Sequence, residues 1–506
     1  MVSSVCKPVK VVRIASLKTV ADFRRQVDSL GLELPCDDAI ATGGGSPLAQ
    51  PLGAFRINGK GIGNRYAVQP MEGWDGTVTG GVTEDVLRRW RRFGESGAKL
   101  IGGGEAMAVC PEGRANPNQL LITEANKLDL VRLREALVKA HQERYGSTHD
   151  LVIGFQLTHS GRFCRPHDKL TPEPRPAYRH PLLDRRSGVT SDRQVLADDE
   201  VERLIEHYIQ AANIAWDVGA DFVDIKHCHG YLLHEFLSAF TRPGRYGGPF
   251  ENRTRVLREI VAGIRASGCP IDLAVRLSVF DLVPFRPDPG QSLPGQPGRG
   301  VPEDFTRHLP YRFAFGVNPH HPLEPDLTEP IQFMALCAQL GVSILNLSAG
   351  SPYYNPHIQR PAAYPPSDAY QPPEDPLVGV ARQIQAARQL KAKAPAGMLL
   401  VGSAYSYLQE YLPHVGQYVL RHGWIDAIGV GRMVLAYPAM LAEAIATGSL
   451  DAKRICRTFS DCTTAPRKGL VSGCYPLDSH YRNKPDYLRL KAIKKTASPA
   501  PPPPGS

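Results

Sequence analysis

The 506-residue sequence lacks the features that would place it in a membrane or outside the cell. No stretch approaches the roughly 18 consecutive apolar residues that a membrane-spanning helix needs. The N-terminus, MVSSVCKPVKVVRIASL, has neither the apolar core nor the cleavage site of a secretory signal peptide. The ten cysteines lie far apart and do not form a disulfide framework. We therefore expect a cytoplasmic protein with reduced cysteines and no membrane partner.

A concentrated basic surface is also missing. The net charge is +9, but the positive residues are scattered, except in the C-terminal stretch RLKAIKKTASPAPPPPGS. Nucleic-acid binding usually requires lysine and arginine gathered on one face of a domain. We therefore expect no nucleic-acid partner and a preference for small anionic ligands. The oligomeric state is left open.

Eight short apolar runs, rich in β-branched residues, alternate with longer amphipathic segments. The runs are typical of strands buried on both faces, and they cover residues 65–69, 98–103, 151–157, 221–226, 272–278, 342–348, 398–402 and 427–431. The segments have helical spacing, with Thr83 as an expected N-cap and Pro413 as a kink or restart. They cover residues 83–98, 198–220, 251–268, 328–341, 376–390 and 407–423.

This alternation predicts an α/β protein with a single (β/α)₈ TIM barrel. A doubly wound open sheet is the alternative, but no glycine-rich fingerprint follows the first run. We divide the chain into an irregular N-terminal extension (1–55), the barrel (56–450), a cysteine-containing segment (451–480) and a disordered basic, proline-rich tail (481–506). A proline-rich loop follows the fifth strand at about 281–330, and is either a lid or a disordered insertion.

In such a barrel the site lies at the carboxyl ends of the strands. The last two strands end in VGSAYS and GVGRMV, where small residues and an arginine suit a phosphate. Alternatively, the glycines only end the strands and Arg432 pairs with a carboxylate. Gln156 and Arg276 end apolar runs, and a buried unpaired arginine costs about 3–5 kcal/mol. Either a polar cofactor ring or an internal salt bridge would supply its partner.

The motifs HGYLLHEFL and RYGGPFENRTRVLREIV resemble the signature of the Old Yellow Enzyme family of FMN-dependent oxidoreductases. The motifs NRYAVQPM, GEAMAVCPEGR, GFQLTHSGR and VRLS extend the resemblance over roughly residues 55–450. It implies a barrel that holds FMN and takes electrons from NADPH or NADH. The resemblance implies that the flavin ring is contacted by Pro70, Met71, Ala106, Gln156 and Arg276. It implies that the phosphate is bound by Gly402, Ser403, Gly431 and Arg432.

The stretch VDIKHCHGYLLHEF carries the implied catalytic residues. In a regular strand His227 and His229 would share one side, which leaves a metal site as an alternative, although we expect none. The resemblance implies instead that Tyr231 protonates an alkene and that His229 binds the substrate carbonyl. Lys226 departs from the family's usual residues there. It would bind a carbonyl or carboxylate of a small-molecule substrate, or simply pair with Glu72, itself a second departure.

The C-terminal segment resembles the part of larger relatives that carries four cysteines for a [4Fe–4S] cluster. Cys462 and Cys474 are kept, but Ile455 and Thr458 stand at the other two positions, so we expect no cluster. The leading hypothesis is an NAD(P)H-dependent ene reductase. The alternatives are a dehydrogenase or demethylase acting on an amine or saturated substrate, and a flavin-free scaffold protein.

Overall fold

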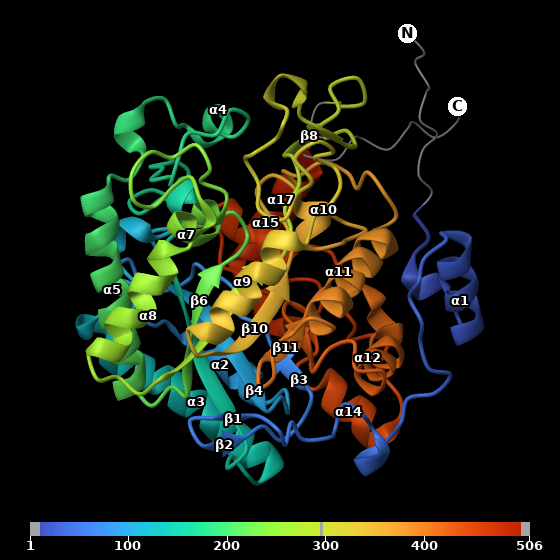
Figure 1. Cartoon of the computed structure of the whole chain (residues 1–506). Helices are drawn as coiled ribbons and strands as arrows, with labels where there is room; N and C mark the ends of the chain where they lie inside the picture. The colour runs from blue at the N-terminus through green and yellow to red at the C-terminus, as the bar shows by residue number, and fades with distance from the viewer. Residues whose placement is uncertain (1–10, 294–296, 497–506) are drawn as a thin grey trace.

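Eight parallel strands form a closed barrel in the computed structural model of the chain, which describes residues 11–293 and 297–496. The spatial order of the strands follows the sequence, and each of the eight apolar runs forms one of them. The (β/α)₈ prediction is therefore confirmed (Figure 1). The strands are β3 (Tyr66–Val68), β4 (Leu100–Ala108), β5 (Val152–Thr158), β6 (Phe222–His227), β7 (Asp272–Ser278), β10 (Val342–Ser348), β11 (Leu399–Gly402) and β12 (Ala427–Val430).

The longer helices surround the barrel, and each of the six predicted segments forms one of them. They are α2 (Glu84–Gly94), α3 (Lys127–Tyr145), α5 (Asp198–Asp217), α8 (Arg255–Ala266), α9 (Thr328–Gln339), α11 (Pro376–Lys391), α12 (Leu412–Arg421) and α14 (Met440–Thr447). The Thr83 hydroxyl accepts a hydrogen bond from the N–H of Val86, as an N-cap does. Pro413 lies in the first turn of α12, after the chain turns at Gln409 with φ 53°, so it restarts the helix.

Helix α3 was not predicted, although it is nineteen residues long. Its buried residues Leu130, Leu133, Leu137 and Ala140 follow the spacing of three and four that indicates a helix. Shorter helices complete the connections: α4 (Asp184–Ser187), α6 (Leu232–Leu237), α7 (Phe250–Arg253), α10 (Pro356–Gln359) and α13 (Met433–Ala436).

A small hairpin closes the amino-terminal end of the barrel, at the bottom of Figure 1. Its strands β1 (Arg56–Ile57) and β2 (Lys60–Gly61) pair antiparallel. Ile57 and Ile62 are buried in one cluster with residues of the strands themselves, including Leu100, Phe222 and Leu399. Because this end is filled with apolar side chains, a ligand can enter the barrel only from the other end.

The N-terminal extension is not irregular throughout, which corrects the prediction for residues 20–29. These residues form α1 (Val20–Ser29), which begins at a capping box of Thr19 and Asp22. Phe23 and Val27, one helical turn apart, are buried, and the Phe23 ring stacks on Tyr411 with centroids 4.5 Å apart. The apolar pair at helical spacing explains why this segment folds against the barrel.

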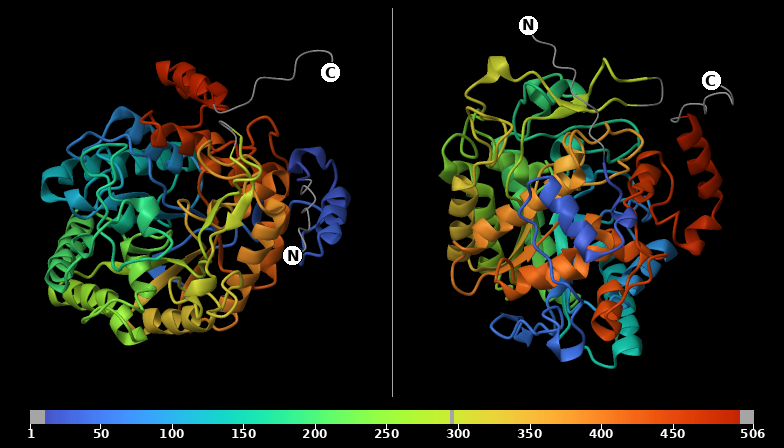
Figure 2. Two further views of the ribbon diagram at one scale, coloured as in Figure 1. Left: turned by 90° about the horizontal axis from the view of Figure 1, so that it is seen from above. Right: turned by 90° about the vertical axis from the view of Figure 1, so that its right-hand side faces the viewer.

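The prediction of a disordered tail is wrong for residues 481–496. The C-terminal region forms α15 (Asp461–Arg467), α16 (Ser479–Arg482) and α17 (Pro485–Thr496), which Figure 2 shows at the edge of the barrel. Leu490 is buried with Tyr475 and Tyr481, and Lys494 forms an ion pair with Asp461 at 2.7 Å. These few apolar contacts outweigh the polar composition. The rest of the predicted tail, 497–506, lies outside the described residues.

The proline-rich loop after the fifth barrel strand is ordered in its described part, which excludes a wholly disordered insertion. Strands β8 (Phe285–Pro287) and β9 (Gly300–Pro302) pair antiparallel near the top of Figure 1. The Phe285 ring contacts His357 with centroids 4.6 Å apart. The loop thus supports the segment after β10. A lid role stays a hypothesis.

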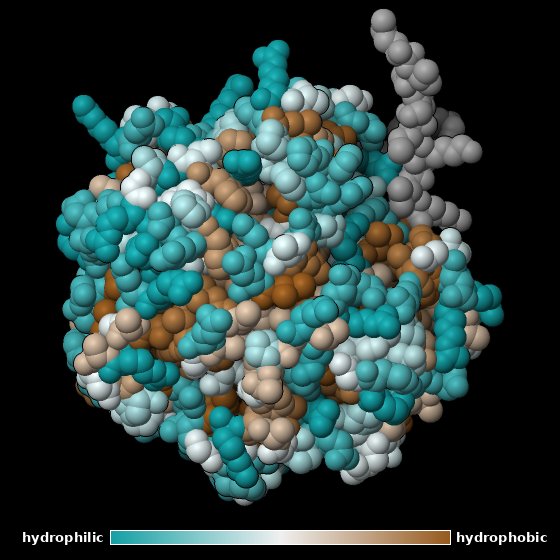
Figure 3. All heavy atoms as spheres, in the orientation of Figure 1, coloured by the Kyte–Doolittle hydropathy of each residue, from teal (hydrophilic) through white to brown (hydrophobic). Residues whose placement is uncertain are grey.

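Hydrophilic residues make up most of the face in Figure 3, and hydrophobic residues gather in separate patches between them. Among the described helices, none is both long and apolar enough to cross a bilayer.

Candidate active site

A cavity of about 210 Å³ opens at the carboxyl ends of the barrel strands. It brings together residues that are far apart in the sequence, from the end of β3 to the C-terminal segment. Ten of the twelve residues predicted for the site line it: Pro70, Met71, Gln156, Lys226, His229, Tyr231, Arg276, Ser403, Gly431 and Arg432.

The other two, Ala106 and Gly402, are not among the lining residues and lie just behind them. The N–H of Ala106 donates to the Met71 carbonyl at 2.9 Å, so it fixes the backbone of a lining residue. A Cβ on Gly402 would lie 2.9 Å from the Tyr405 hydroxyl, so glycine is needed there for packing.

One side of the cavity, at the end of β6, is a compact network of charged and aromatic groups. Lys226 forms an ion pair with the Glu72 carboxylate, and its side chain is only 4% exposed. The Tyr231 hydroxyl donates to Glu72 Oε2 at 2.5 Å and lies 2.7 Å from the Tyr353 hydroxyl. Lys226 Nζ lies 3.7 Å from the centre of the Tyr231 ring. The pairing of Lys226 with Glu72, left open above, is therefore present.

This network keeps Tyr231 protonated. Burial raises the pKa of Tyr231 well above its usual 10, and the nearby Glu72 carboxylate raises it further. A buried, neutral phenol that faces a cavity is a potential proton donor.

The two histidines near Tyr231 have different surroundings. His227 packs on the Phe333 ring, and its Nδ1 lies 3.0 Å from the Ile225 carbonyl. His229 faces the cavity, with Nε2 2.9 Å from Ser348 Oγ. The expectation that both share one side is wrong, because φ at His229 is 66° and ends the strand alternation. Within the described ranges, no cluster of three His, Cys, Asp or Glu residues could hold a metal.

The floor of the cavity is a hydrogen-bonded polar layer. Arg276 Nη1 donates to the Pro70 carbonyl at 2.8 Å, whereas its buried Nε has no partner. Asp224 accepts from Gln156 Nε2 at 3.2 Å and from the Arg276 N–H at 2.8 Å. Burial raises the pKa of Asp224 to about 6. The strand ends thus orient Gln156 and Arg276 through one carboxyl group.

Gln69 was missed by the sequence analysis. It lines the cavity, its Nε2 donates to Ser403 Oγ at 2.6 Å, and its Oε1 lies 3.5 Å from Arg276 Nη2. A polar residue at the end of an otherwise apolar run was the available signal.

At the ends of β11 and β12 the cavity is cationic. Arg432 contacts the Thr463 hydroxyl, and Arg360 Nη1 donates to Ser460 Oγ at 3.2 Å. Burial, together with the charge of Arg360, lowers the pKa of Arg432 to about 9. In the described part of the chain no carboxylate pairs with either guanidinium. The alternative that Arg432 pairs with a carboxylate therefore does not hold.

The roof of the cavity comes from two segments that sequence reasoning did not assign to the site. One is the loop after β10, whose prolines line the cavity: Pro352, Pro356, Pro361, Pro365, Pro366 and Pro372. The other is the C-terminal segment around Ser460 and Arg467. No motif marked either, because their place depends on how they pack across the barrel mouth.

The C-terminal segment resembles the cluster-binding part of larger relatives, and its two positions that lack the cysteine have packing roles. Ile455 is buried in the main core, and the Thr458 hydroxyl accepts from the Ala363 N–H at 3.2 Å. Cys462 lines the cavity, whereas Cys456 and Cys474 are buried. That the segment carries no iron–sulfur cluster stays a prediction.

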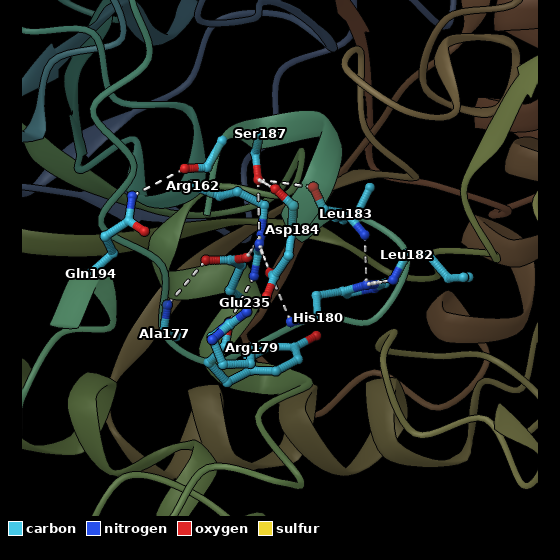
Figure 4. Close-up of polar contacts among 12 residues, drawn as sticks. Arg162, Ala177, Arg179, His180, Leu182, Leu183, Asp184, Ser187, Gln194 and Glu235 are labelled. Atoms are coloured by element: carbon cyan, nitrogen blue, oxygen red, sulfur yellow. Dashed lines mark hydrogen bonds and ion pairs between the residues drawn. The ribbon is translucent and has the colours of Figure 1, made fainter. Parts of the chain in front are cut away.

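Two of the quoted motifs meet in a buried ion network away from the cavity (Figure 4). Arg162, of GFQLTHSGR, donates to Glu235 Oε1 at 2.6 Å and to Asp184 Oδ1 at 2.5 Å. Its side chain is fully buried. Glu235 lies in α6, and this helix begins directly after Tyr231. The network therefore fixes the helix that Tyr231 caps.

These features fit a flavin nucleotide. The polar floor, with its unpartnered Arg276 Nε, suits the oxygens and nitrogens of a flavin ring. The arginines at the other end suit a phosphate. A Cβ on Gly431 would meet open space, as expected where a ligand approaches the backbone. The barrel fold and the lining of its cavity are therefore compatible with a bound flavin nucleotide.

Comparison with known families gives the same result. Residues 51–288 match the model of the NADH:flavin oxidoreductase / NADH oxidase family. The matched stretch contains the motifs HGYLLHEFL and RYGGPFENRTRVLREIV, and this similarity agrees with the Old Yellow Enzyme resemblance seen in the sequence.

Individual relatives are moderately distant. A NADPH dehydrogenase of Geobacillus sp. (strain WCH70) is 30% identical over 240 residues, which cover 46% of this chain and 63% of the relative. The match thus spans less than two thirds of that curated relative.

The solved structures that resemble the chain are more distant in sequence. A 2-naphthoyl-CoA reductase in complex with 2-naphthoyl-CoA has a TM-score of 0.61 at 18% identity, covering 87% of this chain and 58% of that one. An Old Yellow Enzyme homologue from Zymomonas mobilis has a TM-score of 0.50 at 21% identity, covering 78% and 91%. At these identities the likeness supports the barrel fold.

Proposed function

We propose that the protein is an FMN-dependent oxidoreductase that uses NAD(P)H to reduce the flavin and then reduces an activated C=C bond of a small molecule. The observation that carries this proposal is the neutral Tyr231 hydroxyl, which faces the same cavity as Gln156 and Arg276. FMN, when bound and reduced, supplies the hydride. The protein must then supply one proton and hold the substrate.

Tyr231 is the proposed proton donor. Once its proton has moved to the substrate carbon, the phenolate lies beside Glu72, which disfavours it, and beneath Lys226, which favours it. Because the Glu72 carboxylate is already hydrogen-bonded to the hydroxyl, it is placed to take up a proton from solvent and pass it to the phenolate. This network can therefore reset the donor after each turnover.

Lys226 and His229 are the proposed substrate-binding residues. Both line the cavity next to Tyr231. A cation and a neutral imidazole suit a carbonyl or carboxylate oxygen conjugated with the alkene. Such an oxygen would draw electron density from the double bond and activate it for hydride addition.

The test is Tyr231→Phe. General acids contribute about 10²–10⁴-fold, so alkene reduction should slow by at least 10²-fold. Flavin reduction by NADPH should change less than twofold, because it needs no proton from Tyr231. Stopped-flow absorbance separates the two half-reactions. A loss of less than tenfold in alkene reduction would remove Tyr231 from this role.

The alternative, a dehydrogenase or demethylase, is favoured by one observation. Glu72 faces the cavity and would pair with a substrate ammonium group. Anaerobic mixing distinguishes the two: bleaching of the flavin band by NADPH or NADH supports the reductase. Bleaching by an amine but by neither nicotinamide supports the alternative, and a protein that cannot be loaded with FMN would favour the scaffold hypothesis.

A further inference from the structure

We propose that Arg360 is a phosphate-binding residue that acts with Arg432. The two arginines would bind the phosphate of FMN together, and the hydroxyls of Ser460 and Thr463 would complete the site. The inference rests on the proposed FMN cofactor. It adds a residue from the loop after β10 and two from the C-terminal segment to a site otherwise built at the ends of β11 and β12.

The first argument is proximity. Both arginines line the cavity, and the charge of Arg360 lowers the pKa of Arg432. Each guanidinium already contacts a hydroxyl of the same short segment, Arg360 with Ser460 and Arg432 with Thr463. The four side chains therefore converge on one part of the cavity wall.

The second argument is unbalanced charge. Neither guanidinium has a carboxylate partner in the described ranges, and the buried Nη2 of Arg360 has no hydrogen-bond partner. Two like charges held together without a counter-ion are unfavourable, and an unpaired buried donor adds to the cost. A phosphate supplies two negative charges and several acceptor oxygens, and guanidinium groups bind it in a forked geometry.

The third argument is that Arg360 is held in place. It directly follows α10, and its N–H donates to the Pro356 carbonyl at 2.9 Å. Gln383 of α11 donates to the Ile358 carbonyl at 2.6 Å and so fixes α10 against the barrel. The end of α10 therefore presents the arginine to the cavity without a large rearrangement.

The C-terminal segment that carries the hydroxyls of Ser460 and Thr463 is also held in place. Thr458 and Thr464 accept backbone N–H groups of Ala363 and Ser367, each at 3.2 Å. The C-terminal segment thus docks on the loop that carries Arg360, and the two form one wall of the cavity.

The experiment compares FMN with riboflavin, which has the same ring and no phosphate. The full-length protein, stripped of flavin, is titrated with each ligand, and quenching of flavin fluorescence gives the Kd. Arg360→Met should weaken FMN binding at least tenfold and riboflavin binding less than twofold. Arg360→Lys, which keeps the charge, should lose less. Arg382→Met is the matched control, because Arg382 pairs with Glu374 and does not line the cavity.

The outcomes separate this inference from the proposed function. Wild-type protein that binds neither flavin would contradict the cofactor itself. If the wild type prefers FMN and Arg360→Met keeps that preference, Arg360 does not bind the phosphate. Equal weakening of both flavins would make it a structural residue. Unchanged FMN binding with a raised KM for NADPH would assign it to a nicotinamide phosphate instead. Should the methionine variant not fold, the lysine variant decides by the same FMN-to-riboflavin ratio.

Discussion

The two ends of the cavity treat charge in opposite ways. At the end of β6, Lys226 and Glu72 neutralise each other, and Tyr231 is hydrogen-bonded to the same carboxylate. At the ends of β11 and β12, Arg360 and Arg432 are hydrogen-bonded to hydroxyl groups and pair with no carboxylate of the described residues. The first end satisfies its own charges, whereas the second holds two cations without a carboxylate partner in the described residues, which the proposed phosphate would balance.

This difference indicates what each end does. A self-paired network holds the proposed proton donor in one geometry before any ligand arrives. An unpaired cationic end gains most of its stabilisation when a phosphate binds. Variants at the first end should therefore change stability and proton transfer, and variants at the second should change ligand affinity.

The largest expected effect is a loss of stability when the ion pair between Lys226 and Glu72 is disrupted. Glu72→Gln leaves Lys226 charged and buried without a partner, which should lower the free energy of unfolding by about 3–5 kcal/mol. The double variant Glu72→Gln/Lys226→Met removes both charges and should recover most of this loss. Urea denaturation measures both.

A matched control for this pair is Glu33→Gln. Glu33 pairs with Arg388 on the surface, where its side chain is 62% exposed, and should contribute at most about 1 kcal/mol. If Glu72→Gln and Glu33→Gln lowered the free energy of unfolding equally, the conclusion that Lys226 and Glu72 satisfy each other's charge would be contradicted.

The next largest effect is a pH dependence of stability due to Asp224, in the polar floor of the cavity between the two ends. The pKa of Asp224 is raised to about 6, so the folded protein holds this proton more tightly than the unfolded chain does. The resulting stabilisation is present below pH 4 and is lost as the pH rises to about 6. Two pKa units are worth about 3 kcal/mol.

Asp224→Asn tests this sign. The asparagine side chain does not titrate, and Gln156 can turn its amide to meet the new donor. The stability of the variant relative to the wild type should therefore rise by up to about 3 kcal/mol between pH 4 and pH 7. A pH-independent difference in denaturation midpoints would show that folding does not raise the pKa of Asp224.

The smallest effect sharpens the role of Tyr231. Tyr353→Phe removes one hydrogen bond, worth about 1 kcal/mol, from the Tyr231 hydroxyl. Alkene reduction should slow by up to about tenfold, with FMN affinity unchanged. A change in FMN affinity without a change in rate would mean that the two ends are not separate.

The barrel could be predicted because its signal is local. Each strand is a short apolar run, and the carboxyl ends of parallel strands meet at one rim, so Gln156, Tyr231, Arg276 and Arg432 were expected near one another. Arg360 and Ser460 were not. They reach the site through loops whose position depends on packing between segments about 100 residues apart, and no local pattern records that packing.

Departures from regular structure were also invisible in the sequence. The positive φ at His229 separates it from His227, although alternation alone would place them together. In the tail, Leu490 supplies enough buried surface to order a helix that composition argued against. Such outcomes depend on individual tertiary contacts, which residue propensities do not predict.

The wall formed by residues 460–472 also affects how the protein matures. These residues are made after all eight barrel strands, yet they line the same cavity as strand ends made hundreds of residues earlier. During synthesis the barrel strands can all leave the ribosome while one side of the cavity is still missing. Stable capture of the proposed phosphate-bearing cofactor therefore requires these later residues, and a chain cut short near residue 450 would keep the barrel sequence but lose this wall.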